Sequence, residues 1–159
     1  MKNIRSPILK HKLMSMKKIT YKIKIIKSAE QIPPRDNVSA VFLIAFFNNK
    51  ILSIRNERGW DIPGGHLKDN ETLLEGLKRE TLEEAGASFK NARVFATLSS
   101  KKSNKVMLFF VASLCNLGIF TLSEDALERA LLSTDELLRR YYGDKKILTA
   151  LLREAQSRN

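Results

Sequence analysis

Residues 64–87 read GGHLKDNETLLEGLKRETLEEAGA, and this stretch carries most of what the sequence indicates about fold and chemistry. Thr72 with Glu75 three residues later forms a capping-box pattern, and Gly86 is a suitable stop, so we expect a helix from Thr72 to Ala85. At about 100° per residue, one side of this helix is expected to pack on a sheet. The residues of that packing side are Leu74, Leu77, Thr81 and Ala85.

A neighbouring side of the same helix is acidic. It carries Glu80, Glu83 and Glu84, with Arg79 beside Glu83 and with Gly76 among them, where the missing side chain is expected to leave the acidic face open. Carboxylates crowded on one turn destabilise a helix by roughly a few tenths of a kcal/mol per pair. Mg²⁺ offsets such repulsion because it prefers carboxylate and water oxygens. The alternative is a solvated acidic face paired with the chain's lysines, and the three glutamates alone favour that alternative.

The spacing of the surrounding residues favours the metal site instead. The positions concerned are Gly65, Glu71, Arg79, Glu80, Glu83, Glu84 and Gly86. This pattern is similar to the Nudix box, whose fixed positions are all filled at the right spacing. Thr81 and Ala87 depart from it, because both are small where bulkier aliphatic side chains are usual. The segments WDIPGGH at 60–66 and LERALLSTDEL at 127–137 also resemble the family, so the resemblance covers residues 38–137.

The resemblance implies a fold and a reaction. The implied fold class is α/β (α+β): an α/β/α sandwich with a mixed β-sheet and a loop–helix–loop catalytic motif. The implied reaction is hydrolysis of a diphosphate linkage in a nucleoside diphosphate joined to another group. The implied cofactor is Mg²⁺, for which Mn²⁺ is an expected substitute, and the implied attacking group is water.

The resemblance also implies roles for individual residues. The implied metal-binding set is Glu80, Glu83, Glu84, the backbone carbonyl of Gly64, and Asp125 from a later loop, for which an exposed loop acid is the alternative. Either Glu80 or Glu83 is expected to act as general base, and Arg79 is expected to hold a glutamate in place. Gly65, Glu71 and Gly86 are expected to shape the motif, with direct metal ligation as the alternative for Glu71.

For several other residues the sequence gives weaker evidence of a role in the site. Arg55 and Arg58 are candidate contacts for substrate phosphates, and simple solvent exposure is the alternative for both. Trp60 is expected to be core rather than a stacking platform, and His66 is expected to be structural. Cys115 ends an apolar strand and is expected to be buried.

The substrate is narrowed mainly by exclusion. No proline follows Pro63, and the only tyrosines are Tyr21, Tyr141 and Tyr142, so patterns typical of ADP-ribose and dinucleoside polyphosphate enzymes are missing. The group that remains is MutT-like and acts on nucleoside triphosphates, including oxidised ones. Two alternatives stay open: an enzyme that removes phosphates from RNA 5′ ends, and a non-catalytic nucleotide-binding module.

Bulk properties suit a small nucleotide enzyme. The 159 residues fit one domain, and the longest apolar run, Ala40 to Phe47, is far short of a membrane span. Residues 1–30 hold nine basic groups and one acid, so we expect a basic extension over 1–20 and a Nudix domain over 21–159. The extension is expected to be either a solvated, partly disordered tail or a segment that attracts RNA or anionic substrates. With a single cysteine and no signal sequence, a cytoplasmic location without membrane contact is expected. The oligomeric state stays open between a monomer and a homodimer.

Hydrophobic patterning predicts the remaining elements. An irregular loop is expected over residues 59–65, and a last helix is expected from Lys145 to about Ala155, capped by Asp144, with Ile147, Leu148, Leu151 and Leu152 inside. The predicted strands are 20–27, 38–47, 51–55, 93–99, 105–115 and 127–132.

Overall fold

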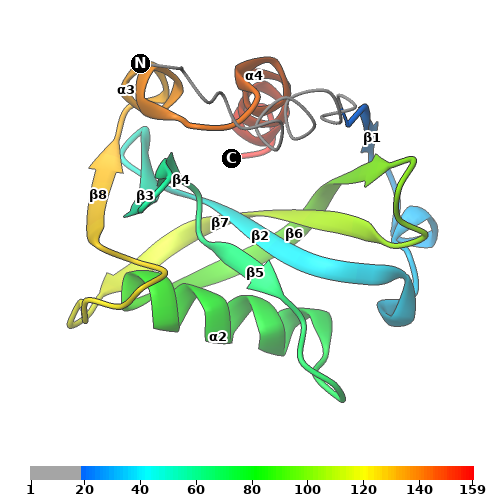
Figure 1. Ribbon diagram of the computed structural model, residues 1–159, viewed down its shortest axis with the longest axis horizontal. Coiled ribbons are helices and arrows are strands. Elements are labelled where there is room, and N and C mark those ends of the chain that lie inside the picture. The colour runs from blue at the N-terminus through cyan, green and yellow to red at the C-terminus, as the bar shows by residue number, and fades with distance from the viewer. Residues whose placement is uncertain (1–18) are drawn as a thin grey trace, which may run out of the picture.

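A computed structural model describes residues 19–159 as a mixed β-sheet with helices on both faces (Figure 1). The strands are β1 Tyr21–Ile25, β2 Val38–Phe47, β3 Lys50–Asn56, β4 Gly59–Asp61, β5 Gly64–His66, β6 Ala87–Ser100, β7 Val106–Leu117 and β8 Glu128–Leu132. The helices are α2 Leu73–Ala85, α3 Thr134–Arg140 and α4 Lys145–Gln156, and η1 Ala29–Gln31 and η2 Arg35–Asn37 are short 3₁₀ turns. The predicted layered fold with a mixed sheet is confirmed.

The centre of the sheet is the parallel pair of β2 and β7, in register at Phe42 and Phe109. The strand order is β1-β6-β7-β2-β3-β4, with β5 paired to β2 and β8 paired to β3, and every other pairing is antiparallel. The long apolar run of β2, predicted as a strand, is buried on both faces. Because successive side chains of a strand point to opposite faces, Leu43 packs in the layer that contains α2 and Ile44 in the layer that contains α4.

Helix α2 lies on one face of the sheet, and its start is the predicted capping box, with Thr72 and Glu75 bonded reciprocally. It ends at Gly86, whose φ of +56° is a left-handed conformation that glycine adopts without strain. Two details of the predicted faces are wrong. Leu74 is 42% exposed rather than packed, and the space over Gly76 is not open, because a Cβ there would collide with Leu67.

Three element predictions differ from the structure. The expected loop over 59–65 contains the short strands β4 and β5, because backbone pairing with neighbouring strands does not require the side-chain pattern of a strand. Strand β6 begins at Ala87 rather than Arg93, and Asn91, at a φ of +56°, lies where the pairing with β7 shifts register. Cys115 is exposed rather than buried, because it lies at the outer end of β7.

The last helix agrees with its prediction. The side chain of Asp144 caps α4, and Leu148, Leu151 and Leu152 are buried, with Ile147 partly buried against them. The expected basic extension over residues 1–20 lies almost wholly outside the described residues, which begin at Ile19. Within residues 19–159 the structure contains no helix with the length and apolar character that spanning a membrane demands.

Candidate active site

The glycines of β5 place the acidic helix against the sheet. Strand β5 pairs with β2, so that Gly64 lies opposite Phe42 and Gly65 opposite Val41. A Cβ on Gly65 would lie 2.6 Å from the carboxylate of Glu80. Only a glycine therefore lets this carboxylate approach the strand, and the spacing of Gly65 and Glu80 in the sequence reflects that contact.

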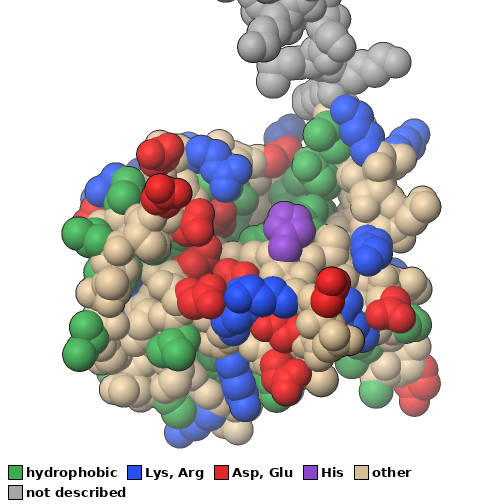
Figure 2. Space-filling model, turned by 60° about the horizontal axis from the view of Figure 1, so that its bottom comes forward, with side chains coloured by type: hydrophobic (Ala, Val, Ile, Leu, Met, Phe, Trp, Pro, Cys, Tyr) green, Lys and Arg blue, Asp and Glu red, His purple; other side chains and the backbone are tan. Residues whose placement is uncertain are grey.

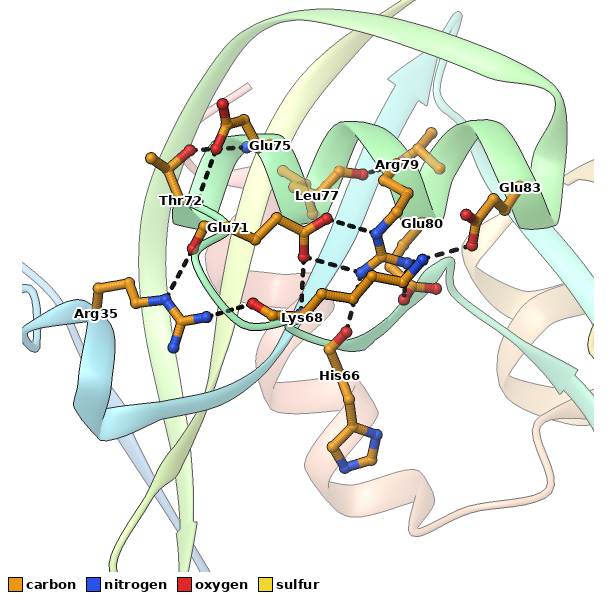
Figure 3. A network of polar contacts seen from close by, with 11 residues as sticks. Arg35, His66, Lys68, Glu71, Thr72, Glu75, Leu77, Arg79, Glu80 and Glu83 are labelled. Carbon is orange, nitrogen blue, oxygen red and sulfur yellow. Dashed lines mark hydrogen bonds and ion pairs between the residues drawn. The ribbon is translucent and has the colours of Figure 1, made fainter.

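Arg79 lies at the centre of a polar network on this side of the molecule (Figure 3). Its guanidinium donates to both carboxylate oxygens of Glu71, at 2.5 and 3.0 Å, and to Glu80 Oε1 at 2.6 Å. Further bonds reach Glu83 Oε2 at 3.2 Å and the carbonyl of His66 at 3.0 Å. The predicted role of Arg79 in orienting a glutamate agrees with this geometry, which links it to three glutamates.

Glu71 is held as part of the framework. Its hydrogen bond from Arg79, followed by one from the backbone N–H of Lys68 at 2.9 Å, lowers the pKa of the Glu71 carboxyl to about 2. The same pairing raises the pKa of Arg79. Both oxygens of Glu71 are thus occupied by donors of the protein, which favours the architectural role over direct metal ligation.

Glu84 has a different environment from the other glutamates of α2. Its Oε2 accepts a hydrogen bond from the N–H of Gly64 at 2.9 Å. Burial, helped by the nearby carboxylates of Glu80, Asp61 and Asp125 and opposed by the Gly64 hydrogen bond, raises the pKa of its carboxyl to about 8. The structure therefore concentrates negative charge around Glu84 from three separate parts of the chain.

Such a charge surplus is what a divalent cation neutralises. Glu80, Glu83, Glu84 and Asp125 offer only oxygen donors, which suit Mg²⁺. Within residues 19–159, no three acidic, histidine or cysteine side chains already converge as a ready metal site. Glu80 is paired with Arg79, while the Glu83 side chain is 55% exposed. The donor chemistry fits the ion.

A cavity of about 430 Å³ opens beside Glu84, lined in part by Gly64, Gly65 and His66. Phe42 and Phe109 form one wall as stacked rings with centroids 5.2 Å apart. Figure 2 shows acidic side chains gathered on the same face, with the histidine side chain beside a hollow. The acidic cluster and a partly apolar cavity are thus neighbours, and small-molecule sites commonly combine apolar walls with a few polar groups in this way.

The polar wall of the cavity contains Arg58, a candidate from the sequence, together with Asp61 and Tyr142, which the sequence did not single out. Asp61 Oδ2 accepts a hydrogen bond from the hydroxyl of Tyr142 at 3.0 Å, and the guanidinium of Arg58 lies 5.0 Å from the Tyr142 ring centroid. Burial raises the pKa of the Asp61 carboxyl. Tyr141 pairs with Trp60 through a backbone bridge and lines the cavity as well. Eighty-one positions separate Asp61 from Tyr142, so no local spacing could have indicated their contact.

Of the other residues singled out from the sequence, some line the cavity and others lie outside it. Arg58 lines the cavity, whereas Arg55 forms an ion pair with Glu128 at 2.9 Å and is not among the lining residues. Trp60 is buried in the core, as expected. Gly86 ends α2, where Arg129 donates to the carbonyl of Ala85 at 2.7 Å and so holds the end of the helix.

The chain is similar to known proteins in both sequence and fold. The family model of the NUDIX domain matches residues 36–152. Among solved structures, the chain is similar to a variant of the pyrophosphohydrolase BsRppH of Bacillus subtilis, with a TM-score of 0.70, 19% identity, and coverage of 86% of this chain and 91% of that one. No curated protein sequence matches the chain.

Two further solved structures are similar over most of the chain. The mutator MutT protein of Bacillus halodurans has a TM-score of 0.56 and 23% identity, covering 71% of this chain and 80% of that one. A NUDIX hydrolase from Nitrosomonas europaea has a TM-score of 0.52 and 26% identity, covering 72% and 74%.

Proposed function

Because the chain belongs to the Nudix family, whose domain model matches residues 36–152, we propose that it hydrolyses nucleoside triphosphates at a diphosphate linkage. That it is a Nudix pyrophosphohydrolase of diphosphate-containing substrates follows from the family itself. The triphosphate substrate is the finer proposal. The observation that supports a phosphate-cleaving site is the partly buried Glu84 carboxyl, crowded by other carboxylates and bordering the cavity.

The acidic residues around Glu84 are the proposed cation site. Nudix hydrolases generally use divalent metal ions, typically Mg²⁺. The residues proposed to hold the ion are Glu80, Glu83, Glu84, Asp125 and the backbone carbonyl of Gly64. When bound, Mg²⁺ supplies charge neutralisation for phosphate oxygens and lowers the pKa of water. The position of the Glu84 carboxyl beside those of Glu80, Asp61 and Asp125 supports this assignment.

The protein's own groups have distinct parts in the reaction. Arg79 orients Glu80 and Glu83 through its guanidinium, and Glu71 in turn fixes Arg79. Glu80 and Glu83 are both candidates to accept the proton of the attacking water. The exposure of Glu83 favours it, since Glu80 is largely buried against Arg79.

The cavity is the proposed site of the nucleoside. Its volume of about 430 Å³ falls in the range of small-molecule sites. The Phe42 and Phe109 wall offers apolar area to a base or sugar, while Asp61, Tyr142 and Arg58 offer polar contacts. The phosphates would then extend toward Glu84. In this arrangement Arg58 retains its predicted contact with substrate, while Arg55 is held by Glu128.

An RNA 5′-end pyrophosphohydrolase is the second candidate. It is favoured by the fold similarity to BsRppH, the highest TM-score among the neighbours named above, and by the nine basic residues within 1–30. A triphosphorylated RNA end and a free triphosphate present the same anhydride to the acidic site. Binding of RNA through phosphates would be strongly salt-dependent. Removal of residues 1–18 without loss of RNA affinity would count against this candidate.

The test is phosphate release with Mg²⁺ from a panel of substrates, with and without added pyrophosphatase. The panel contains normal and oxidised nucleoside triphosphates, nucleotide sugars, dinucleotides and triphosphorylated RNA. Glu84→Gln should abolish turnover, while the matched control Glu154→Gln, on α4 across the sheet, should retain it. Nucleotide binding without turnover on any member would favour the non-catalytic module.

A further inference from the structure

Arg35 reaches from the start of the central strand to the loop that precedes α2. Its Nε donates to the carbonyl of Glu71 at 2.7 Å, and its Nη2 donates to the carbonyl of Lys68 at 2.6 Å. Figure 3 shows this guanidinium on the opposite side of Glu71 from Arg79. Arg35 lies one residue before the part of the chain that the family model matches.

The backbone around Arg35 is well fixed. Pro33 and Pro34 restrict the chain immediately before it, because each proline ring fixes φ. Arg35 then begins the 3₁₀ turn η2, closed by a bond from the N–H of Asn37 to the carbonyl of Pro34 at 2.9 Å. Strand β2 starts at the next residue, Val38. The Arg35 side chain therefore extends from a conformationally restricted segment just before the central strand β2.

The loop before α2 runs alongside β2 in the opposite direction. Backbone pairing joins Gly64 to Phe42 and His66 to Ala40, and the N–H of Leu67 donates to the carbonyl of Ser39 at 3.1 Å. Beyond Leu67 the loop turns away through Asn70, whose φ is +63°. The guanidinium of Arg35 continues the attachment past that point, by holding the carbonyls at both ends of the turn.

Glu71 is consequently held from two directions. Arg35 holds its backbone carbonyl, and Arg79 together with the N–H of Lys68 holds its carboxylate. Arg79 in turn contacts Glu80 and Glu83. A displacement of the turn at residues 68–71 would therefore move the carboxylate that positions Arg79, and with it two glutamates of the proposed cation site.

We propose that Arg35 is a positioning residue for the cation site of α2, an inference that rests on the proposed function. A planar guanidinium suits this task, because its fork holds two carbonyls in one fixed arrangement. Its ion pair with Asp36 is long, at 3.8 Å, and the Asp36 side chain is exposed, so that pair adds little. The contribution of Arg35 lies in the two carbonyl bonds.

The proposal predicts that loss of Arg35 weakens cation binding but has little effect on nucleotide binding. Groups that orient metal ligands typically change metal affinity or activity by about 10- to 100-fold when removed. Loss of Arg35 should therefore weaken cation binding about tenfold. The nucleoside cavity should be little affected, because Asp61, Phe109 and Tyr142 belong to β4, β7 and the segment before α4. At saturating Mg²⁺ the KM for nucleotide should stay within about twofold of wild type.

The experiment measures Mn²⁺ binding to the full chain without nucleotide, by electron paramagnetic resonance, beside the Mg²⁺ dependence of turnover. The variants are Arg35→Ala, Arg35→Gln and Arg35→Lys. Arg158→Ala is the matched control, because Arg158 also bonds a distant carbonyl, that of Ile26 at 2.8 Å, but makes no contact with the box. Thermal unfolding of each variant establishes that it is folded under the conditions of the binding measurement.

We expect the Kd for Mn²⁺ to rise about tenfold in Arg35→Ala and Arg35→Gln and less in Arg35→Lys, with Arg158→Ala unchanged. If Arg35→Ala and Arg35→Gln are folded and bind Mn²⁺ with wild-type affinity, the proposal is overturned. If Arg35→Ala does not fold, the Mn²⁺ affinity of Arg35→Gln decides the question. An equal loss in Arg158→Ala also overturns it, because general destabilisation would explain both. Absence of Mn²⁺ binding in the wild type contradicts the proposed function itself, and the inference with it.

Discussion

Arg79 and Glu71 form a two-pronged ion pair across the turn that begins α2, with N–O distances of 2.5 and 3.0 Å, and both side chains are largely buried. The planar guanidinium matches the carboxylate, so the pair fixes orientation as well as distance. The loop–helix unit is thus closed by its own side chains before any ligand binds.

Glu71→Gln should make the protein less dependent on pH in the acid range. In the wild type the pKa of Glu71 is about 2 when folded, against an ordinary value of 4.5. Its stabilising contribution is therefore present above pH 4.5 and is lost as the pH falls toward 2. The melting temperature of Glu71→Gln should be lower than that of the wild type at pH 7, and the gap should close in acid. A gap that stays constant with pH would contradict the role of this carboxylate.

Glu84 should have the opposite dependence on pH. Its folded pKa of about 8 lies above its ordinary value of 4.5, so between these values the unfolded chain releases its proton first. Stability without divalent cations should therefore fall as the pH rises from about 4.5 to 8. Glu84→Gln should flatten this slope, and so should added Mg²⁺ in the wild type. Calorimetric melting with EDTA and with Mg²⁺ provides the measurement.

Gly65→Ala should impair activity more than stability. Its new Cβ would lie 2.6 Å from the Glu80 carboxylate, which must move away. Because that carboxylate is the end of a flexible side chain, the fold should tolerate the shift, while kcat should fall at least about tenfold. Gly118→Ala, in the segment after β7, is the control, because a Cβ there would approach the carbonyl of Gly86 at 3.1 Å and no atom of Glu80. A loss of kcat that is no larger than in Gly118→Ala would show that the position of Glu80 is unimportant.

Tyr142→Phe should change substrate binding rather than the chemical step. The substitution keeps the ring beneath Arg58 but removes the hydroxyl that donates to Asp61 at 3.0 Å. Loss of a hydrogen bond of this kind costs about 1 kcal/mol of folding stability and leaves Asp61 without its partner in the cavity wall, so KM should rise by at most roughly fivefold. Steady-state kinetics should show that increase with an unchanged kcat. An effect confined to kcat would indicate that Tyr142 acts on the reacting phosphate instead.

The helix and its acidic residues could be predicted because their determinants are local. The capping box of Thr72 and Glu75 and the stop at Gly86 depend on neighbours within a few positions, and the structure has all three. The two predictions about the helix faces that were wrong depend on residues outside the helix. Leu74 is exposed because the sheet lies elsewhere around the helix, and Gly76 is covered because Leu67 packs over it.

The sequence by itself determined the family, because the box residues lie at fixed separations along one helix and its flanking loop. Through that resemblance it implied the mixed-sheet fold and the acidic residues proposed to bind the cation. Only the tertiary structure decided which other groups join them. Pairing of β5 with β2 brings the loop within reach of Arg35, and the segment between α3 and α4 brings Tyr142 to Asp61. Such contacts join residues 36 and 81 positions apart, and a single sequence has no periodicity that reports them, because they depend on how the strands are ordered in the sheet.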